Sequence, residues 1–357
     1  MAVNRRSPEL HDALAQVAPG RPLRDGLDRV LQAGMGALIV VGDGPDVLNI
    51  CSGGFLLDAA YSPQRLSELA KMDGAIILAA DASRIARANV HLVPNPNVPT
   101  TETGTRHRTA ERVARSISVP VISVSQRMSV ISVYASDSKT ELEPTPRVVN
   151  RANQALQTLE RYKARLDTEA GSLLGLEIED LVTLRDVATV LQRTEMVSRI
   201  AEEIGGYILE LGVDGRLFRL HLEELMAGVA DDRRLVIRDY QREGSAWGLD
   251  EAVAALANLS TDDLLDLKRV VGVLDSGNVQ ELETGVTPRG YRMLAMIPRL
   301  PDAVIERIVN QFLSLPRIMR ATIDDLDDVE TVGEARARAV KEGLARLAET
   351  SLLDRYL

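Results

Sequence analysis

Two hydrophobic patterns alternate over the first 147 residues of the chain. Apolar side chains recur with helical spacing over 10–18 and 23–33, which predicts two amphipathic helices. The runs 36–43 and 74–80 are instead short and almost continuously apolar, as expected of buried strands. Because helix and strand signals interleave, we predict an α/β domain with a mixed sheet.

Capping and turn residues add detail to this first region. Ser62 precedes Pro63, and serine caps a helix while proline suits its first position, so a helix is predicted from there to about Lys71. The apolar segments 119–125 and 129–134 flank three turn residues, which predicts a β-hairpin. A loop is predicted to lead into a further helix over about 106–117.

Helical spacing dominates the rest of the chain. The Pro-rich segment 143–146 is predicted to be a linker. From 148 to about 285 the pattern predicts an all-α bundle, and after 289 it predicts short helices broken by proline and glycine. We therefore predict a multidomain protein, with domains at 1–147, 148–288 and 289–357.

Composition and charge narrow the class of protein. The 357 residues are 45% hydrophobic and 26% charged, the balance of a soluble globular protein. The net charge is −10, and it arises in the middle region, 148–288, which has 26 acidic and 15 basic residues. This region is expected to repel DNA, so any contact with DNA is predicted to lie elsewhere.

Cysteine and hydropathy patterns exclude other classes. Cys51 is the single cysteine, so neither an internal disulfide nor a cysteine-based zinc cluster is possible. Neither a signal peptide nor an apolar run of the roughly 20 residues that a membrane span needs is found, which predicts a cytoplasmic protein. Cys51 precedes Ser52-Gly53-Gly54 and is interpreted as a small buried residue, with a loop near a nucleotide as the alternative.

Two short motifs in the first region carry candidate chemistry. Asp73-Gly74-Ala75 lies where a helix gives way to a buried strand, and 104–110 (Gly-Thr-Arg-His-Arg-Thr-Ala) lies where a loop enters a helix. A helix N-terminus flanked by arginines suits phosphate, because free N–H groups and positive charge meet there. Taken alone, the first motif is usually a simple turn, and the second is most often a solvated basic patch. No P-loop sequence occurs.

Together these motifs resemble the diadenylate cyclase family, in the architecture of DNA-scanning proteins with a C-terminal helix-hairpin-helix domain. The resemblance rests on 36–40, Asp73-Gly74-Ala75 and 104–109, and it extends over the whole chain. It implies that Asp73 meets both the metal and the ribose 3′-hydroxyl and that Arg106-His107-Arg108 holds phosphates. The remaining ATP-site residues that it implies are Gly74, Leu92, Thr105, Thr109 and Ser125.

The implied reaction condenses two ATP molecules into cyclic di-AMP and two pyrophosphates. Asp73 is expected to bind Mg²⁺ or Mn²⁺ and to help deprotonate the hydroxyl, while Arg106 and Arg108 neutralise the leaving pyrophosphate. His107 is expected to donate to a phosphate oxygen, with a packed structural histidine as the alternative. Two ATP molecules must face each other, so two protomers must meet around a twofold axis. The family implies a larger homo-oligomer, an octamer.

A second motif lies near the C-terminus. The pattern Leu326-x-x-Val329-x-Thr331-Val332-Gly333 is similar to a helix-hairpin-helix, whose backbone N–H groups bind a DNA phosphate without reading bases. Thr331 replaces the usual first glycine, and a degenerate upstream copy covers 294–301. The family implies binding to branched DNA and association with the nucleoid. The predicted DNA-binding residues are Val332, Gly333, Arg336, Arg338 and Lys341.

Other candidates receive structural interpretations. His11, His91 and His221 stand singly without metal-ligand partners, so core or surface roles are predicted for them. The rival functional hypothesis is a non-catalytic DNA-binding scaffold that holds a nucleotide only as a regulatory ligand. The presence of both Asp73 and Arg106-His107-Arg108 favours the enzyme.

Overall fold

The computed structural model describes residues 7–278 and 281–354. Packing divides the chain into two compact units. The first unit comprises Asn4–Ala155 and Glu203–His221, and the second is formed mainly by Leu156–Glu202 and Leu222–Leu357. The segment Glu203–His221 therefore packs with the α/β region although it follows it in sequence. The domain boundaries predicted near 147 and 288 stay predictions.

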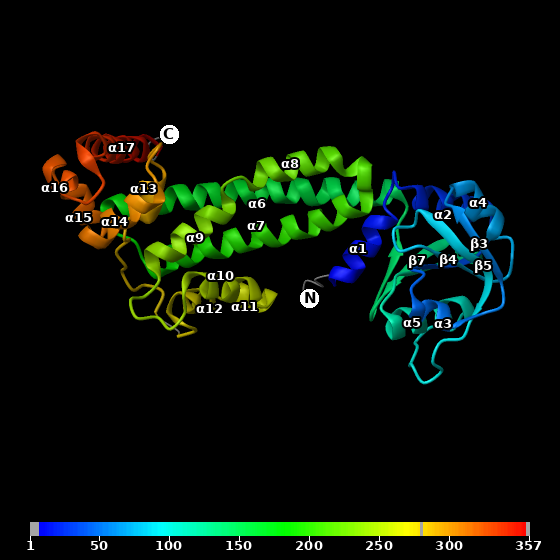
Figure 1. Ribbon diagram of the computed structural model, residues 1–357. Coiled ribbons are helices and arrows are strands. Elements are labelled where there is room, and N and C mark those ends of the chain that lie inside the picture. The colour runs from blue at the N-terminus through cyan, green and yellow to red at the C-terminus, as the bar shows by residue number, and fades with distance from the viewer. Residues whose placement is uncertain (1–6, 279–280, 355–357) are drawn as a thin grey trace. The chain divides into compact units, whose positions relative to one another are not determined.

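The first unit contains the sheet and its covering helices (Figure 1). Its elements are α1 (Pro8–Gln16), α2 (Pro22–Gln32), β1 (Ala37–Val41), α3 (Pro45–Asn49), β2 (Cys51–Ser52), β3 (Phe55–Ala60), α4 (Pro63–Leu69), β4 (Ala75–Leu78), β5 (Arg84–Leu92), α5 (Thr105–Ile117), β6 (Val121–Ser125), β7 (Val130–Ala135) and β8 (Ser138–Leu142).

The sheet is mixed, as predicted. Its strand order is β2-β5-β4-β1-β6-β7-β8, with β3 pairing with β5 beside this path. β1 and β4 are parallel, whereas β1 with β6, β4 with β5 and β6 with β7 are antiparallel. The antiparallel β6–β7 pair confirms the predicted hairpin.

Helices cover both faces of this sheet, because the side chains of each strand alternate between two cores. On one face Ile39 and Ile76 pack with residues of α1, α2 and α4. On the other face Val40 and Ile77 pack with residues of α3 and α5. Figure 1 shows the two groups of helices on opposite sides of the strands. The nearly uninterrupted apolar sequence of β1 follows from this double burial.

Helices form nearly all of the remaining chain, as predicted, and α6, α7 and α8 cross the boundaries between the units. The elements are α6 (Thr145–Glu179), α7 (Leu184–Leu211), η1 (Gly212–Gly215), α8 (Arg216–Met226), α9 (Val229–Tyr240), α10 (Leu249–Asn258), α11 (Thr261–Leu265), α12 (Leu267–Gly272), η2 (Val273–Asp275), α13 (Tyr291–Ala295), α14 (Asp302–Phe312), α15 (Leu315–Arg320), α16 (Ile323–Asp327) and α17 (Gly333–Asp354).

One local prediction was wrong. The segment 143–146 is not a free linker, because α6 begins at Thr145 and the carbonyl oxygen of Pro144 accepts hydrogen bonds from the N–H groups of Arg147 and Val148. Pro146 therefore lies in the first helical turn, where its missing N–H costs nothing. The two prolines therefore lie at the start of a helix.

A buried polar cluster fixes the start of α13 within the second unit. Asp239 accepts hydrogen bonds from the backbone N–H groups of Gly290, Tyr291 and Arg292, at 2.7, 2.7 and 2.8 Å. The guanidinium of Arg292 donates to Glu177 Oε2 at 2.5 Å and to the Ala170 carbonyl at 2.6 Å. Burial raises the pKa of Glu177 to about 7, although Arg292 opposes that shift. Helices α6, α9 and α13 are thereby joined through paired buried charges.

Candidate active site

Six of the predicted ATP-site residues line one cavity of about 380 Å³ in the first unit. The cavity lies where β4, β5 and the first turn of α5 approach one another. These residues come from segments that are distant in sequence, so the fold assembles the site. The lining residues are Leu38, Asp73, Gly74, Ala75, Val90, His91, Leu92, Thr105, Arg106 and Thr109.

Asp73 presents its carboxylate fully to solvent at this cavity. Its side chain is 100% exposed, and Arg106 Nη2 donates to Asp73 Oδ1 at 3.1 Å. The two predicted motifs, 33 residues apart in sequence, therefore meet through one ion pair. An exposed pair of this kind contributes little to stability, so both side chains are available to a ligand.

Two glycines make this approach possible. A Cβ atom at Gly74 would lie 2.5 Å from the carbonyl carbon of Asn89, so only glycine allows β4 and β5 to approach at the start of the cavity. A Cβ atom at Gly36 would lie 2.4 Å from Arg106 Nη1. Gly36 thus leaves the space through which the Arg106 guanidinium reaches Asp73.

We expect Gly36→Ala to lower ATP affinity about 10-fold, because the displaced Arg106 loses a charge-assisted contact to phosphate. Isothermal titration with a non-hydrolysable ATP analogue measures the change. Gly44→Ala is the matched control, since Gly44 belongs to the same unit and has nothing within 4 Å of its Cβ position. Equal loss of affinity in both variants, or none in Gly36→Ala, would contradict the role of Arg106.

The first turn of α5 offers free backbone donors. Gly104 is its N-cap and supplies no side-chain hydrogen bond, so the first N–H groups of the helix are open to an anion. Arg108 is exposed, and the structure records no side-chain ion pair for it among the described residues. Arg108 does not line the cavity, but it lies on the same helical turn as Arg106.

His107 and Ser125 also lie outside the cavity lining. The Nδ1 atom of His107 lies 2.8 Å from the Tyr134 hydroxyl, and Ser125 Oγ accepts from the Met128 N–H at 3.3 Å in the β6–β7 turn. His91 does line the cavity, although the sequence pattern predicted only a core or surface role. His91 lies at the end of β5, which carries arginines and was not predicted as a strand. Without that strand, no sequence pattern placed His91 beside the cavity.

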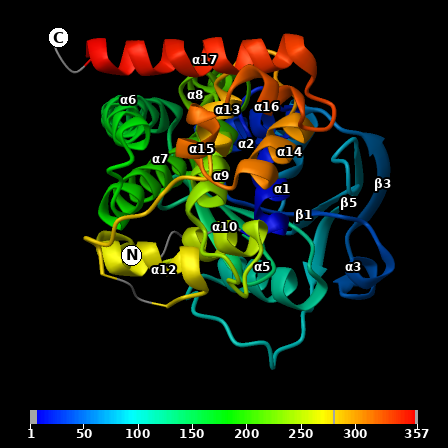
Figure 2. The ribbon, with the colours of Figure 1, turned by 90° about the vertical axis from the view of Figure 1, so that its left-hand side faces the viewer.

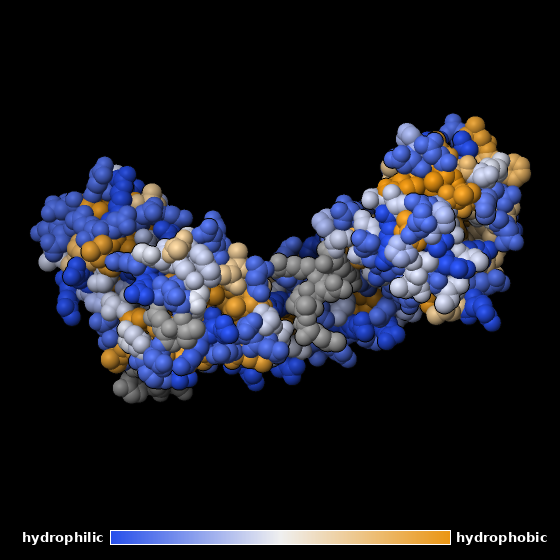
Figure 3. Space-filling view, turned by 90° about the horizontal axis from the view of Figure 1, so that it is seen from below, coloured by the Kyte–Doolittle hydropathy of each residue, from blue (hydrophilic) through white to orange (hydrophobic). Residues whose placement is uncertain are grey.

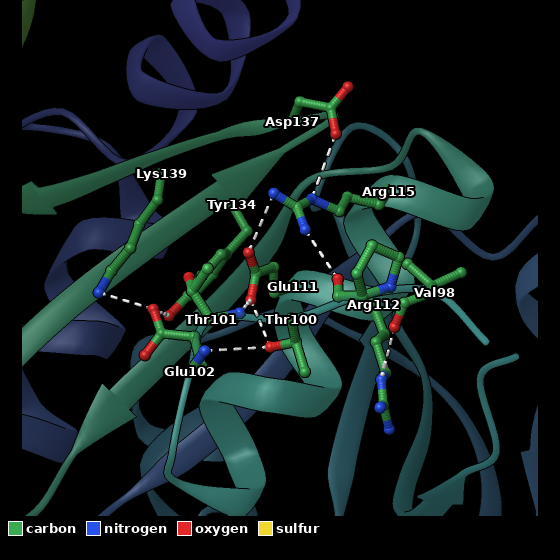
Figure 4. A network of polar contacts seen from close by, with 11 residues as sticks. Val98, Thr100, Thr101, Glu102, Glu111, Arg112, Arg115, Tyr134, Asp137 and Lys139 are labelled. Carbon is green, nitrogen blue, oxygen red and sulfur yellow. Dashed lines mark hydrogen bonds and ion pairs between the residues drawn. The ribbon is translucent and has the colours of Figure 1, made fainter. Parts of the chain in front are cut away.

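α5 holds the loop that precedes it through polar side chains (Figure 4). Glu111 accepts from the Thr101 N–H at 3.1 Å and also from the Thr100 hydroxyl. Arg112 and Arg115 donate to the carbonyl groups of Val98 and Pro99, at 3.0 and 2.7 Å. Since this loop joins Leu92 to Thr105, these bonds fix the distance between two walls of the cavity.

A second candidate site lies in the C-terminal helices, where α16 and α17 form a hairpin. Thr331 and Gly333 have positive φ angles of +72° and +67°, and the N–H of the buried Val332 donates to the Val329 carbonyl at 3.0 Å. Thr331 therefore adopts the left-handed conformation that its usual glycine would adopt. Figure 2 shows α17 extended over the shorter helices α13 to α16.

The degenerate upstream copy forms a similar hairpin between α13 and α14. Arg299 has a φ angle of +63° and occupies the position that matches Thr331. Leu294 and Ile297 are buried at the positions that match Leu326 and Val329. The two hairpins share one apolar core, so the loss of both glycines upstream did not remove the turn.

All three of the predicted basic DNA contacts have partners within the protein. Arg336 Nη1 donates to the Thr331 carbonyl at 2.6 Å, and Lys341 Nζ donates to the Met319 carbonyl at 2.9 Å. Arg338 forms an ion pair with Glu334. The first bond lies within the hairpin, the second joins α17 to α15, and the ion pair lies along α17. Gly333 itself is exposed and has nothing within 4 Å of its Cβ position.

Comparison with known proteins identifies the family. The family model described as DisA bacterial checkpoint controller nucleotide-binding matches residues 24–139, and the DisA bacterial checkpoint controller linker region matches residues 142–282. The DNA integrity scanning protein DisA of Frankia alni is 56% identical over 348 residues, which cover 96% of each chain. The chain belongs to the DisA family.

Other DisA proteins match to the same extent. The DNA integrity scanning protein DisA of Kineococcus radiotolerans is 55% identical over 356 residues, 99% of each chain. That of Streptomyces coelicolor is 53% identical over 349 residues, which cover 97% of this chain and 93% of the relative. These matches confirm the predicted enzyme class: the chain is a diadenylate cyclase, a nucleotidyltransferase. Within the described part of the chain, no helix is both long and apolar enough to span a membrane.

The residues of the cavity fit a metal ion whose ligands come partly from the protein and partly from the substrate. Among the described residues no cluster of three or more His, Cys, Asp or Glu side chains is suited to a metal ion, so the chain offers no complete cage. Mg²⁺ is commonly bound through one or two carboxylates with substrate phosphates and water completing its shell. The exposed carboxylate of Asp73 matches that requirement.

Proposed function

We propose that the chain joins two ATP molecules into cyclic di-AMP and releases two pyrophosphates. The observation that carries this proposal is the meeting of Asp73, Arg106 and the open N-terminus of α5 at one cavity. In each half-reaction a 3′-oxygen forms a bond to the α-phosphorus of the other ATP. The bond from that phosphorus to the pyrophosphate oxygen breaks in the same step.

The residues of the cavity have two roles: removal of the proton of the 3′-hydroxyl and neutralisation of the charge on the pyrophosphate. Asp73 orients the 3′-hydroxyl and takes part in removing its proton. Arg106 and Arg108, with the N–H groups of α5, neutralise the charge that develops on the departing pyrophosphate. Bound Mg²⁺ or Mn²⁺, held by Asp73 and the phosphates, supplies further charge neutralisation.

A single cavity holds one ATP, so we propose that two protomers face each other around a twofold axis, as pairs within a larger assembly such as an octamer. The exposed apolar surface of the first unit supports this arrangement. Phe55, Leu56 and Leu57 on β3 are 56%, 76% and 38% exposed, and β3 pairs with β5, the strand whose end lines the cavity. Figure 3 shows hydrophobic surface on this unit.

Incubation of the full chain with ATP and Mn²⁺, followed by chromatography, tests the reaction. We expect a dinucleotide and two equivalents of pyrophosphate, with a specific activity that falls when dilution separates the protomers. ATP binding without any product would favour the rival function, a DNA-binding scaffold with a regulatory nucleotide. A specific activity that stays constant in demonstrably monomeric protein would contradict the facing arrangement.

We propose further that the α13–α14 and α16–α17 hairpins bind DNA phosphates through backbone N–H groups, and that this binding lowers cyclase output. One hairpin pair holds few phosphates, so affinity arises from several copies in the assembly. Branched DNA, whose arms reach more than one copy, is therefore expected to bind more tightly than duplex of equal length. Association with the nucleoid follows from the same contacts. Titration of a four-way junction and a duplex, with product measured in parallel, tests both halves of this proposal.

We expect Gly333→Leu to weaken binding to the junction about 10- to 100-fold, because the exposed hairpin loses close contacts between N–H groups and a charged phosphate. Fluorescence anisotropy measures the affinity, and the loss is expected to be independent of base sequence. Gly228→Leu is the matched control: Gly228 is also exposed, has a φ angle of +76° and has open space at its Cβ position. The proposal fails if both variants bind the junction equally.

A further inference from the structure

His107 lies at one end of a chain of hydrogen bonds that the proposed reaction does not use. Its Nδ1 atom lies 2.8 Å from the Tyr134 hydroxyl. That hydroxyl donates to Glu102 Oε1 at 3.0 Å, and Lys139 Nζ lies 2.8 Å from the same carboxylate oxygen. Figure 4 shows the side chains of Tyr134 and Lys139 converging on Glu102.

The ionisation of Glu102 determines which group donates in each of these hydrogen bonds. Burial alone would raise the pKa of Glu102, but hydrogen bonds from Lys139 and Tyr134 outweigh burial and lower it. The carboxylate is therefore ionised and only accepts hydrogen bonds. The Tyr134 hydroxyl must give its one proton to Glu102, which leaves its oxygen to accept from His107. The Nδ1 atom of His107 consequently carries a proton.

Glu102 is itself fixed to the helix that carries His107. Its backbone N–H donates to the Thr100 hydroxyl oxygen at 3.1 Å, and that hydroxyl donates to Glu111 on α5. Because Glu111 follows His107 by one turn of the same helix, the carboxylate and the imidazole are held in one rigid piece. Tyr134, 1% exposed on β7, joins that piece to the sheet.

We propose that Tyr134 and Glu102 are positioning residues for the diadenylate cyclase reaction, which hold His107 in the Nδ1–H tautomer and reserve Nε2 for the nucleotide. The opposite edge of the ring lies by the helix N-cap, since His107 Cδ2 is 3.4 Å from the Cβ position of Gly104. Nε2 neighbours Cδ2, so Nε2 belongs to the edge of the ring that lies nearest the N-cap of α5. The proposal rests on the proposed function for its effect on catalysis, but not for the tautomer.

A fixed tautomer determines what His107 can bind. Burial lowers the pKa of His107, although Glu102 opposes that shift, so the ring is neutral at neutral pH. A neutral ring with a proton on Nδ1 offers Nε2 as an acceptor. It therefore selects a hydrogen-bond donor of the nucleotide, such as a ribose hydroxyl, over a phosphate oxygen.

Solid-state ¹⁵N NMR of the full chain labelled only at histidine tests the tautomer directly. The chain has four histidines, and His107→Gln assigns the signal. We expect a protonated Nδ1 and a bare Nε2 in the wild type, and transfer of the proton to Nε2 in Tyr134→Phe. A protonated Nε2 in the wild type at neutral pH would overturn the proposal, whatever the enzyme makes.

The catalytic half of the proposal is tested by turnover. We expect Tyr134→Phe to lower kcat about 10-fold or more, by analogy with the loss of a partner that orients a metal-binding histidine. Glu102→Gln keeps an acceptor for Tyr134 and is expected to retain more activity. Tyr61→Phe, which removes a hydroxyl that donates to the Pro22 carbonyl at 3.1 Å, is the control and should match the wild type. Unchanged kcat in Tyr134→Phe overturns the positioning role, whereas an inactive wild type refutes the proposed function alone.

Discussion

Asp73→Asn is expected to abolish synthesis of cyclic di-AMP while leaving ATP binding largely intact. Asparagine keeps the size of the side chain and removes the charge that is proposed to hold a metal and to receive the proton of the 3′-hydroxyl. Loss of such a carboxylate costs several kcal/mol of barrier, about three orders of magnitude in rate. The side chain is fully exposed, so the substitution disturbs no buried contact.

Two measurements separate this loss from a general defect. Pyrophosphate release under saturating ATP reports turnover, and titration with a non-hydrolysable analogue reports binding. Asp81→Asn is the matched control, because Asp81 is another exposed carboxylate of the same unit, which accepts from Ser83 in a turn. Turnover of Asp73→Asn at the wild-type rate would refute the catalytic role, and equal losses in both variants would indicate a structural effect.

Arg292→Met is expected to destabilise the second unit by about 3–5 kcal/mol at pH 8, where Glu177 is ionised. Glu177 is 1% exposed, and Arg292, 3% exposed, supplies its compensating charge. Removal of the guanidinium leaves the buried Glu177 carboxylate with a hydrogen bond from the Tyr240 hydroxyl, 2.8 Å away, but without the positive charge that compensates it. Trp247, the single tryptophan, belongs to the second unit, so its fluorescence in urea reports this unfolding.

Two further variants test the cause of that loss. Arg185→Met removes a surface pair with Glu283, whose side chains are 50% and 72% exposed, and is expected to cost less than about 1 kcal/mol. Glu177→Leu combined with Arg292→Met removes both buried charges and is expected to recover most of the stability. A double variant as unstable as Arg292→Met would show that packing, not the unpaired charge, causes the loss.

Local sequence signals predicted much of the first unit. The apolar runs at 36–43 and 74–80 became β1 and β4, and Ser62 caps α4 by accepting from the Arg65 N–H. Strands β3 and β5 were not predicted. β3 is an exposed edge strand whose apolar and polar residues do not alternate, and its Asp58 has a positive φ angle. β5 carries arginines and breaks its register around Asn89, which also has a positive φ.

The sequence by itself determined the family, the α/β nature of the first region and the motifs that carry Asp73 and Arg106, because these depend on short local patterns. Only the tertiary structure decided which residues meet. It brought His91 to the cavity, turned His107 toward Tyr134, and placed Gly36 under Arg106. Such contacts join segments far apart in the chain, and their geometry depends on strand order and register, which no local pattern specifies.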